Sequence, residues 1–184
     1  ARSPMSTKPS FENLHLASTH IRKVATGQLI RFEKEGLFVL TEDTTDVQKG
    51  TAICVVDDRY PRFTYPNELT QPLVYMSTNT EAEAVKQNID AKQALDMFFL
   101  QLSQGNHSVA KQIIRSYFRR VTDANRLFTN YKEGWKTDRG MVYIIMGPPS
   151  RIQRLREREV WLYAQTENTS EVIFTFFRKP NQFT

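Results

Sequence analysis

The chain has 184 residues, of which 40% are apolar and 24% charged, so it can bury a core and is not of the disordered class. No apolar run approaches the roughly 20 residues that a membrane-spanning helix needs, and a single cysteine excludes an intrachain disulfide. The formal net charge of +5 comes from the second part of the chain, mainly between His107 and Arg158. Such a region is typical of a surface that meets nucleic acid, an acidic partner or an anionic membrane, and also of a solvated face.

Residues 1–78 are predicted to form a β-rich N-terminal region. Short apolar or alternating runs, separated by Gly, Asp and Pro, occupy residues 14–19, 27–36, 37–45, 50–58 and 62–66. Their spacing is typical of hairpins, so we expect an antiparallel sheet. Cys54 is interpreted as a buried strand thiol. An extended piece at residues 73–77 follows, and the domain boundary is predicted near residue 78.

Residues 79–184 are predicted to form an α+β domain, in which a helical hairpin packs on a small antiparallel sheet. The first helix is expected from Glu81 to Leu102, after a cap at Thr78 or Thr80, and the second from about Ser108 to about Tyr131. Three later runs are predicted strands, at residues 140–147, 159–166 and 171–179. The turn at residues 167–170 makes the last two a hairpin.

A helical wheel divides the second helix into an apolar half and a basic stripe. Together with the arginines that follow the predicted strand, the stripe forms a candidate basic surface of Lys111, Arg115, Arg119, Arg126, Arg151 and Arg154. Nucleic-acid binding favours stacking aromatics interleaved with such charges, whereas the aromatics here alternate into the predicted core. A solvated or partner-facing surface is therefore favoured over nucleic-acid binding.

The stretch "EGWKTDRGMVYIIMGPPSRI", residues 133–152, lies between the second helix and the strands. It supplies most of a candidate binding or structural motif: Gly134, Trp135, Thr137, Asp138, Arg139, Gly140, Gly147, Pro148, Pro149 and Trp161. In the structural interpretation, Gly134 ends the helix in a left-handed conformation and Trp135 covers the helix end. Thr137 and Asp138 then accept hydrogen bonds from backbone N–H groups of the turn.

In the functional interpretation, Trp135 is a stacking platform beside Asp138 and Arg139, as in sugar or peptide sites. Catalysis by Asp138 needs a second carboxylate or a histidine, and Glu133 is the only near candidate. The sequence "GPPSR" is not a phosphate loop, because prolines supply no N–H donors. We therefore expect no catalytic residues, no cofactor and no metal site; the three histidines are scattered without metal-ligand spacing.

The segment from Ala124 to Tyr131, the motif stretch and the following "EVWLYAQ" resemble the GWxTD domain, a bacterial family named after this motif. Residues that match the family pattern include Gly134, Trp135, Thr137, Asp138, Arg139, Gly140, Tyr143, Gly147, Pro148, Pro149, Trp161 and Tyr163. Family members generally carry Asp after Gly-Pro-Pro. Here Ser150 stands in its place, so no role of that acid is carried over.

The resemblance implies an exported protein of the periplasm or cell envelope and names no activity for the domain. We therefore expect a non-catalytic protein whose second domain is a protein-interaction or scaffold module, with another envelope protein as its partner. The alternative is a glycan- or peptide-binding module centred on Trp135 and Trp161. Nucleic-acid binding through the basic surface is a weaker third interpretation.

Overall fold

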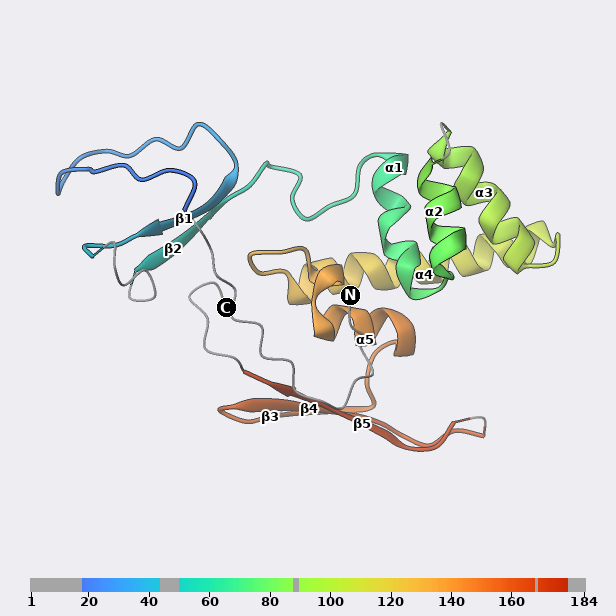
Figure 1. Cartoon of the computed structure of the whole chain (residues 1–184). Coiled ribbons are helices and arrows are strands. Elements are labelled where there is room, and N and C mark those ends of the chain that lie inside the picture. Colours follow the sequence, from blue (N-terminus) through green and yellow to red (C-terminus); the bar gives the residue numbers. More distant parts are fainter. Residues whose placement is uncertain (1–17, 44–49, 88–89, 168, 179–184) are drawn as a thin grey trace.

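The computed structural model of the chain describes residues 18–43, 50–87, 90–167 and 169–178. These parts contain helices and two small antiparallel sheets, so the predicted α+β class is confirmed. Figure 1 shows the helices gathered above the three-stranded sheet, with the two-stranded sheet to one side. None of the described helices is both long and apolar enough to cross a membrane.

The described residues of the N-terminal part contain fewer strands than predicted. Among residues 18–43 and 50–78, only β1 (Gly36–Leu40) and β2 (Thr51–Val55) form, as an antiparallel pair. The run at residues 27–35 stays irregular, and Leu29 within it is 92% exposed. Without a partner strand or a core to cover it, an alternating run gains too little burial to hold a sheet conformation.

Two more of the predicted runs and the predicted burial of Cys54 belong to the same N-terminal region. Residues 62–65 form no strand, and of the first predicted run residues 14–17 lie outside the described part of the chain, while Ser18 and Thr19 are not in a strand. Cys54 is exposed, not buried as predicted. The reason is that neither strand of this pair contains a fully buried residue, so the pair lacks a core of its own.

Two short helices replace the predicted extended connector. They are α1 (Pro66–Leu69) and the 3-10 helix η2 (Gln71–Tyr75). Within η2, Pro72 and Leu73 are fully buried, and the hydroxyl of Tyr117 donates a hydrogen bond to the Pro72 carbonyl. The core of the later helices thus extends before residue 78, and a domain boundary at that residue stays a prediction.

The predicted first helix is divided into α2 (Asn79–Gln87) and α3 (Ala91–Leu102). Thr78 begins α2, because its backbone N–H donates to Glu81 Oε2 at 2.8 Å and its Oγ1 accepts from the Glu81 N–H. Asp90 begins α3 by accepting hydrogen bonds from two backbone N–H groups. A second capping residue within the predicted helix therefore starts a new one.

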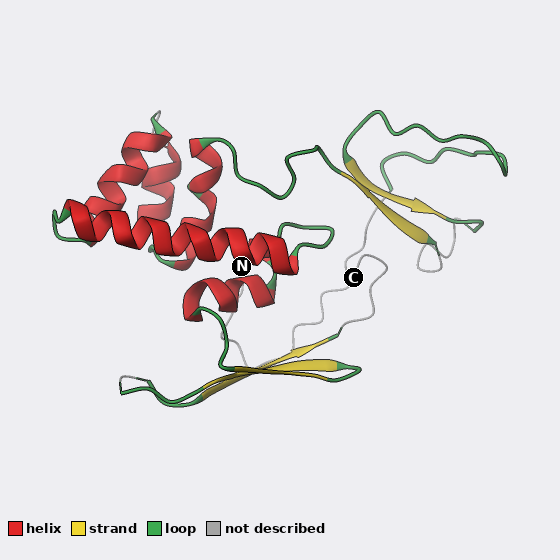
Figure 2. Cartoon of the chain, turned by 180° about the vertical axis from the view of Figure 1, so that it is seen from behind, coloured by secondary structure: helices red, strands yellow, loops and turns green. Residues whose placement is uncertain are grey.

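The longest helix is α4 (His107–Phe128), close to the predicted span. Asn106 caps its start, and four residues of the predicted apolar half are buried: Tyr117, Val121, Ala124 and Phe128. The stripe of Lys111, Arg115, Arg119 and Arg126 is exposed on the opposite side, as the wheel predicts. In Figure 2, α4 lies across α2 and α3 and above α5.

The predicted strand at residues 140–147 is wrong. This segment forms α5 (Asp138–Met146), which follows the one-turn 3-10 helix η3 (Gly134–Lys136). A short apolar run has no periodicity that separates a buried strand from a buried helix. The cap at Thr137 provides that signal, because its side chain accepts the N–H of Gly140.

The second sheet has the order β3–β4–β5 and is antiparallel throughout. β4 (Arg158–Tyr163) and β5 (Val172–Phe177) form the predicted hairpin, whereas β3 (Arg151–Arg154) lies outside the three predicted strands. All four residues of β3 are exposed, so its sequence lacks the apolar alternation that marks a strand.

One core joins the helices to the inner face of this sheet. Trp161 of β4 is fully buried and contacts the rings of Phe128 and Phe176. The core includes Leu73, Phe99, Tyr117, Val121, Phe128, Trp135, Ile144 and Trp161. Elements from η2 to β4 therefore share one hydrophobic interior.

Candidate functional site

The GWKTD corner links the end of α4 to the start of α5 and depends on two close backbone approaches. A Cβ atom on Gly134 would lie 2.0 Å from the carbonyl oxygen of Ala124, and one on Gly140 would lie 1.8 Å from that of Gly134. Gly134 does not have the predicted left-handed backbone; the described glycines with positive φ lie elsewhere in the chain. The corner needs these glycines for space, not for backbone freedom.

Thr137 provides the hydrogen bonds that close the corner. Its buried hydroxyl donates to the carbonyl of Gly134 at 2.7 Å and accepts the N–H of Gly140 at 3.0 Å. Asp138, predicted to share this role, is exposed, and its carboxylate makes no hydrogen bond to any residue that the structure describes. Its position in the first turn of α5 leaves it a favourable interaction with the helix dipole.

Trp135 lies inside the core, with 6% of its surface exposed. Its ring contacts those of Phe63 and Tyr75, and its carbonyl accepts a hydrogen bond from the Tyr75 hydroxyl at 2.8 Å. Burial raises the pKa of Tyr75 to about 12, with the charge of Asp138 as a second cause. Trp135 Nε1 has no hydrogen-bond partner in the described structure. The indole is thus a core side chain without an open face.

Arg139 and Trp161 meet through a residue that the sequence did not single out, Glu159. Its carboxylate accepts Trp161 Nε1 at 2.6 Å and pairs with Arg139 at 3.3 Å and with Arg154 at 3.7 Å. The Arg139 guanidinium also lies over the ring of Phe128. This network connects α5 and β3 to β4, so these charged side chains are used in contacts within the fold.

The Gly147-Pro148-Pro149 turn leads from α5 into β3. Gly147 has a φ of +82°, and its carbonyl accepts the hydroxyl of Tyr163 at 2.9 Å. Arg120 of α4 donates to the carbonyls of Ile144 and Ile145 at the end of α5. The turn is a helix end, where a strand end was predicted.

Asn125 connects three segments and was not identified from the sequence. Its Nδ2 donates to the carbonyl of Pro61 at 2.8 Å, and its Oδ1 accepts the N–H of Trp135 at 2.9 Å. The sequence could have identified Asn125, because this polar residue lies four residues after Val121 and thus on the apolar face of α4. A polar side chain on such a face needs internal partners.

The candidate basic surface is divided between two elements. Arg151 and Arg154 lie on β3, at the opposite side of α5 from the stripe on α4 (Figure 1). Arg154 and Arg126 are also paired, with Glu159 and Asp123. The structure therefore does not bring the six residues into one patch.

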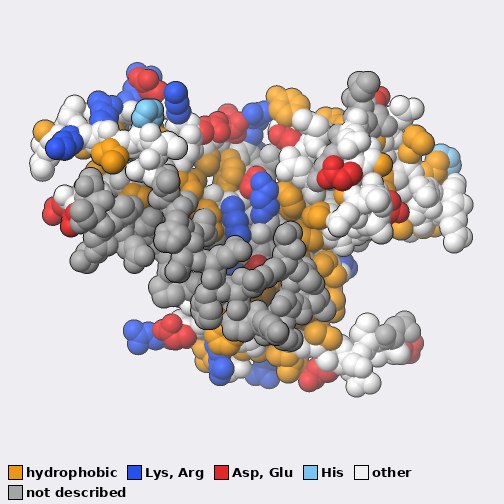
Figure 3. Space-filling view, viewed as in Figure 1, with side chains coloured by type: hydrophobic (Ala, Val, Ile, Leu, Met, Phe, Trp, Pro, Cys, Tyr) orange, Lys and Arg blue, Asp and Glu red, His pale blue; other side chains and the backbone are white. Residues whose placement is uncertain are grey.

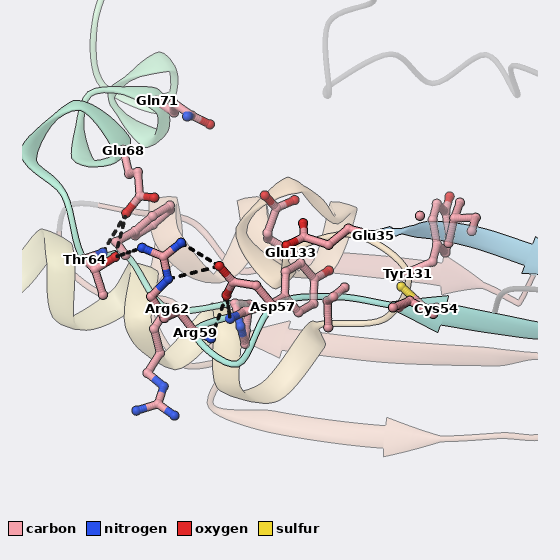
Figure 4. Close-up of a pocket in the computed structure, with 17 residues that line it drawn as sticks. Glu35, Cys54, Asp57, Arg59, Arg62, Thr64, Glu68, Gln71, Tyr131 and Glu133 are labelled. Carbon is pink, nitrogen blue, oxygen red and sulfur yellow. Dashed lines mark hydrogen bonds and ion pairs between the residues drawn. The ribbon is translucent and has the colours of Figure 1, made fainter. Parts of the chain in front are cut away.

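A surface cavity of about 460 Å³ opens beside the corner, between the end of the strand pair and residues 131–133 (Figure 4). Asp57 and Arg59 form an ion pair at 2.6 Å within it, and this hydrogen bond lowers the pKa of Asp57. Burial, then the charge of Glu133, raises the pKa of Tyr60 to about 12. Cys54 lines the cavity, and no histidine does. The titratable groups that share the cavity with the thiol include the carboxylates of Glu35 and Glu133.

The described residues contain no group of three or more His, Cys, Asp or Glu side chains that could hold a metal ion. No curated protein and no solved structure matches the chain. The family model of the GWxTD domain matches residues 36–184, from β1 through the corner and the sheet to the end of the chain. By this match, which covers the motif and all of the cavity lining except Glu35, the chain belongs to the GWxTD domain family.

Proposed function

We propose that the protein is a non-catalytic interaction module of the cell envelope, exported to the periplasm, and that another envelope protein binds it. The location comes from the family resemblance. The motif residues favour a structural role, because Gly134, Trp135 and Thr137 are all used in internal contacts. A binding function then needs a different surface.

The observation that carries the proposal is the outer face of the three-stranded sheet. Strand alternation places Leu162, Ile173 and Phe177 on the face opposite Trp161, and Ile173 and Phe177 are 57% and 69% exposed. Exposed arginines, Arg151 and Arg158, lie in the same strands. Figure 3 shows apolar and basic side chains together along the lower side of the molecule, where this sheet lies.

An apolar face rimmed by charge is typical of a protein-binding surface. The glycan alternative lacks such support, because Trp135 and Trp161 are 6% and 0% exposed and present no ring for stacking. We therefore keep the protein partner as the proposed function.

Photo-crosslinking in native cells tests the proposal. A photoreactive phenylalanine analogue replaces Leu162, at the centre of the outer face, and as a matched control Gln112, exposed on α4. We expect an adduct with a second envelope protein from position 162 only. Equal adducts from both positions, or none from position 162, would contradict an interaction through this face.

A further inference from the structure

The two edge strands of the three-stranded sheet differ in charge. β3, with the turn that follows it, carries Arg151, Arg154 and Arg156, and charged side chains protect an edge strand against pairing with another chain. β5 has the sequence VIFTFF, with no charge, proline or glycine. Its only strand partner among the described residues is β4. In the part of the chain that the structure describes, the β3 edge is therefore protected by charge, and the β5 edge is unpaired and uncharged.

We propose that β5 pairs antiparallel with β5 of a second copy of this chain, across a two-fold axis at Thr175. Opposed residues of an antiparallel pair lie on the same face, so the outer faces join only if odd-numbered residues oppose odd-numbered ones. Centring the pair on Thr175 meets this condition. It places Ile173 opposite Phe177 on the outer face and Phe174 opposite Phe176 on the inner face.

Side-chain chemistry favours a second copy of the chain as the partner of β5. Aromatic pairs and pairs of an aromatic with a β-branched residue are the favourable cross-strand combinations, and this register forms both kinds twice. Two copies form a continuous six-stranded sheet whose exposed edges are the two arginine-bearing β3 strands.

Disulfide trapping tests the dimer with a control in the same row of the sheet. Gln153, Val160 and Thr175 are cross-strand neighbours, so positions 153 and 175 mark the two edges at one height. In a Cys54→Ser background, Thr175→Cys should yield a disulfide-linked dimer under mild oxidation, since opposed Cα atoms lie about 4.5–5.5 Å apart. Gln153→Cys should stay monomeric. Equal trapping at both positions, or none at position 175, overturns the proposal.

A pair of introduced charges tests the register independently of oxidation. Ile173→Glu should weaken dimerisation at least about tenfold in sedimentation, because it places a charge opposite Phe177 of the other copy. Adding Phe177→Lys should restore the dimer through two pairs of opposite charge across the axis. A double variant that stays monomeric while melting like the parent overturns the register. The dimer does not depend on the proposed envelope partner, because crosslinks between two copies and crosslinks to another protein differ in mass.

Discussion

At the scale of single residues, the GWKTD stretch shows how a motif of functional appearance is used for structure. Gly134 and Gly140 give the space in which α4, η3 and α5 meet, and Trp135 fills the core behind them. The structural interpretation of the sequence correctly predicted that Thr137 accepts a backbone N–H, but its assignments for Gly134 and Asp138 were wrong. The left-handed glycine is not Gly134, and the cap is Thr137 without Asp138.

We expect substitution of Thr137 to lower the free energy of unfolding more than substitution of its neighbour Asp138. Thr137→Ala should lower the free energy of unfolding by about 2 kcal/mol, the upper range for a capping residue, because the hydroxyl bonds two buried backbone groups. Asp138→Asn should cost only about 0.5 kcal/mol, the size of an exposed charge at a helix start. Urea denaturation of both variants measures these losses.

Thr137→Ser is the matched control, since it keeps the capping oxygen and should retain most of the stability. If Asp138→Asn costs as much as Thr137→Ala, the carboxylate has a role that its exposed position does not explain. The absence of catalysis by Asp138 stays a prediction, to be tested by screening the parent and Asp138→Asn for hydrolytic activities.

At the scale of secondary structure, the sequence predicted elements best where length or periodicity was strong. α4 spans six turns with one apolar face, and its span and its exposed stripe were predicted. α5 and β3 were not, for opposite reasons. α5 is a short apolar run that is compatible with either a helix or a strand, while β3 is exposed at all four residues and carries no apolar pattern.

The packing of α5 against the corner predicts that a helix-favouring substitution will destabilise the protein. Glycine to alanine within a helix normally gains about 1 kcal/mol. At Gly140 the new Cβ would lie 1.8 Å from the carbonyl oxygen of Gly134, so backbone must move. Gly140→Ala should therefore lose about 3 kcal/mol or more, the upper range for overpacking. Thermal unfolding followed by circular dichroism measures the change.

Gly105 supplies the comparison, because a Cβ there meets nothing within 4 Å although its φ is +81°. Gly105→Ala should cost only the strain of a left-handed residue, about 1–2 kcal/mol. A stabilised Gly140→Ala variant would show that the corner has room to relax and that the glycine is not required by the fold.

At the scale of the whole molecule, sequence periodicity could not predict the contacts between segments that lie far apart in sequence. Two polar side chains connect the strand pair to the helices by bonding backbone atoms far away in sequence. Tyr60 donates to the carbonyl of Asn130, 70 residues away, and Asn125 donates to that of Pro61, 64 residues away. Such a bond leaves no repeat in the sequence. It can be found only as a polar side chain at a position where the helical pattern expects an apolar one.

Asn125 makes the shorter of these two hydrogen bonds, 2.8 Å against 3.3 Å, and its exchange for aspartate tests the connection. Asn125→Asp keeps an acceptor for the N–H of Trp135 but removes the donor to the Pro61 carbonyl, and it places a carboxylate in a buried position. At pH 7 the free energy of unfolding should fall by about 3 kcal/mol, the size of the penalty for a buried unsatisfied group. Burial next to a carbonyl oxygen raises the pKa of the new carboxyl group above its unfolded value.

Because the folded protein raises the pKa of this carboxyl group, the stability of Asn125→Asp should fall as the pH rises. A group with a raised folded pKa stabilises the fold below its unfolded pKa of about 3.9, and this stability is lost as the pH rises through the folded value. The protonated acid can also donate to the Pro61 carbonyl. Urea denaturation should therefore show a smaller loss for Asn125→Asp near pH 4 than at pH 7, measured against the parent at each pH.

Asn106→Asp is the matched control, at the exposed cap of α4, where either side chain accepts the same N–H groups. It should change stability by no more than about 0.5 kcal/mol. A loss at Asn125 that is equal at both pH values would mean that the contact with Pro61 does not hold the strand pair to the helices.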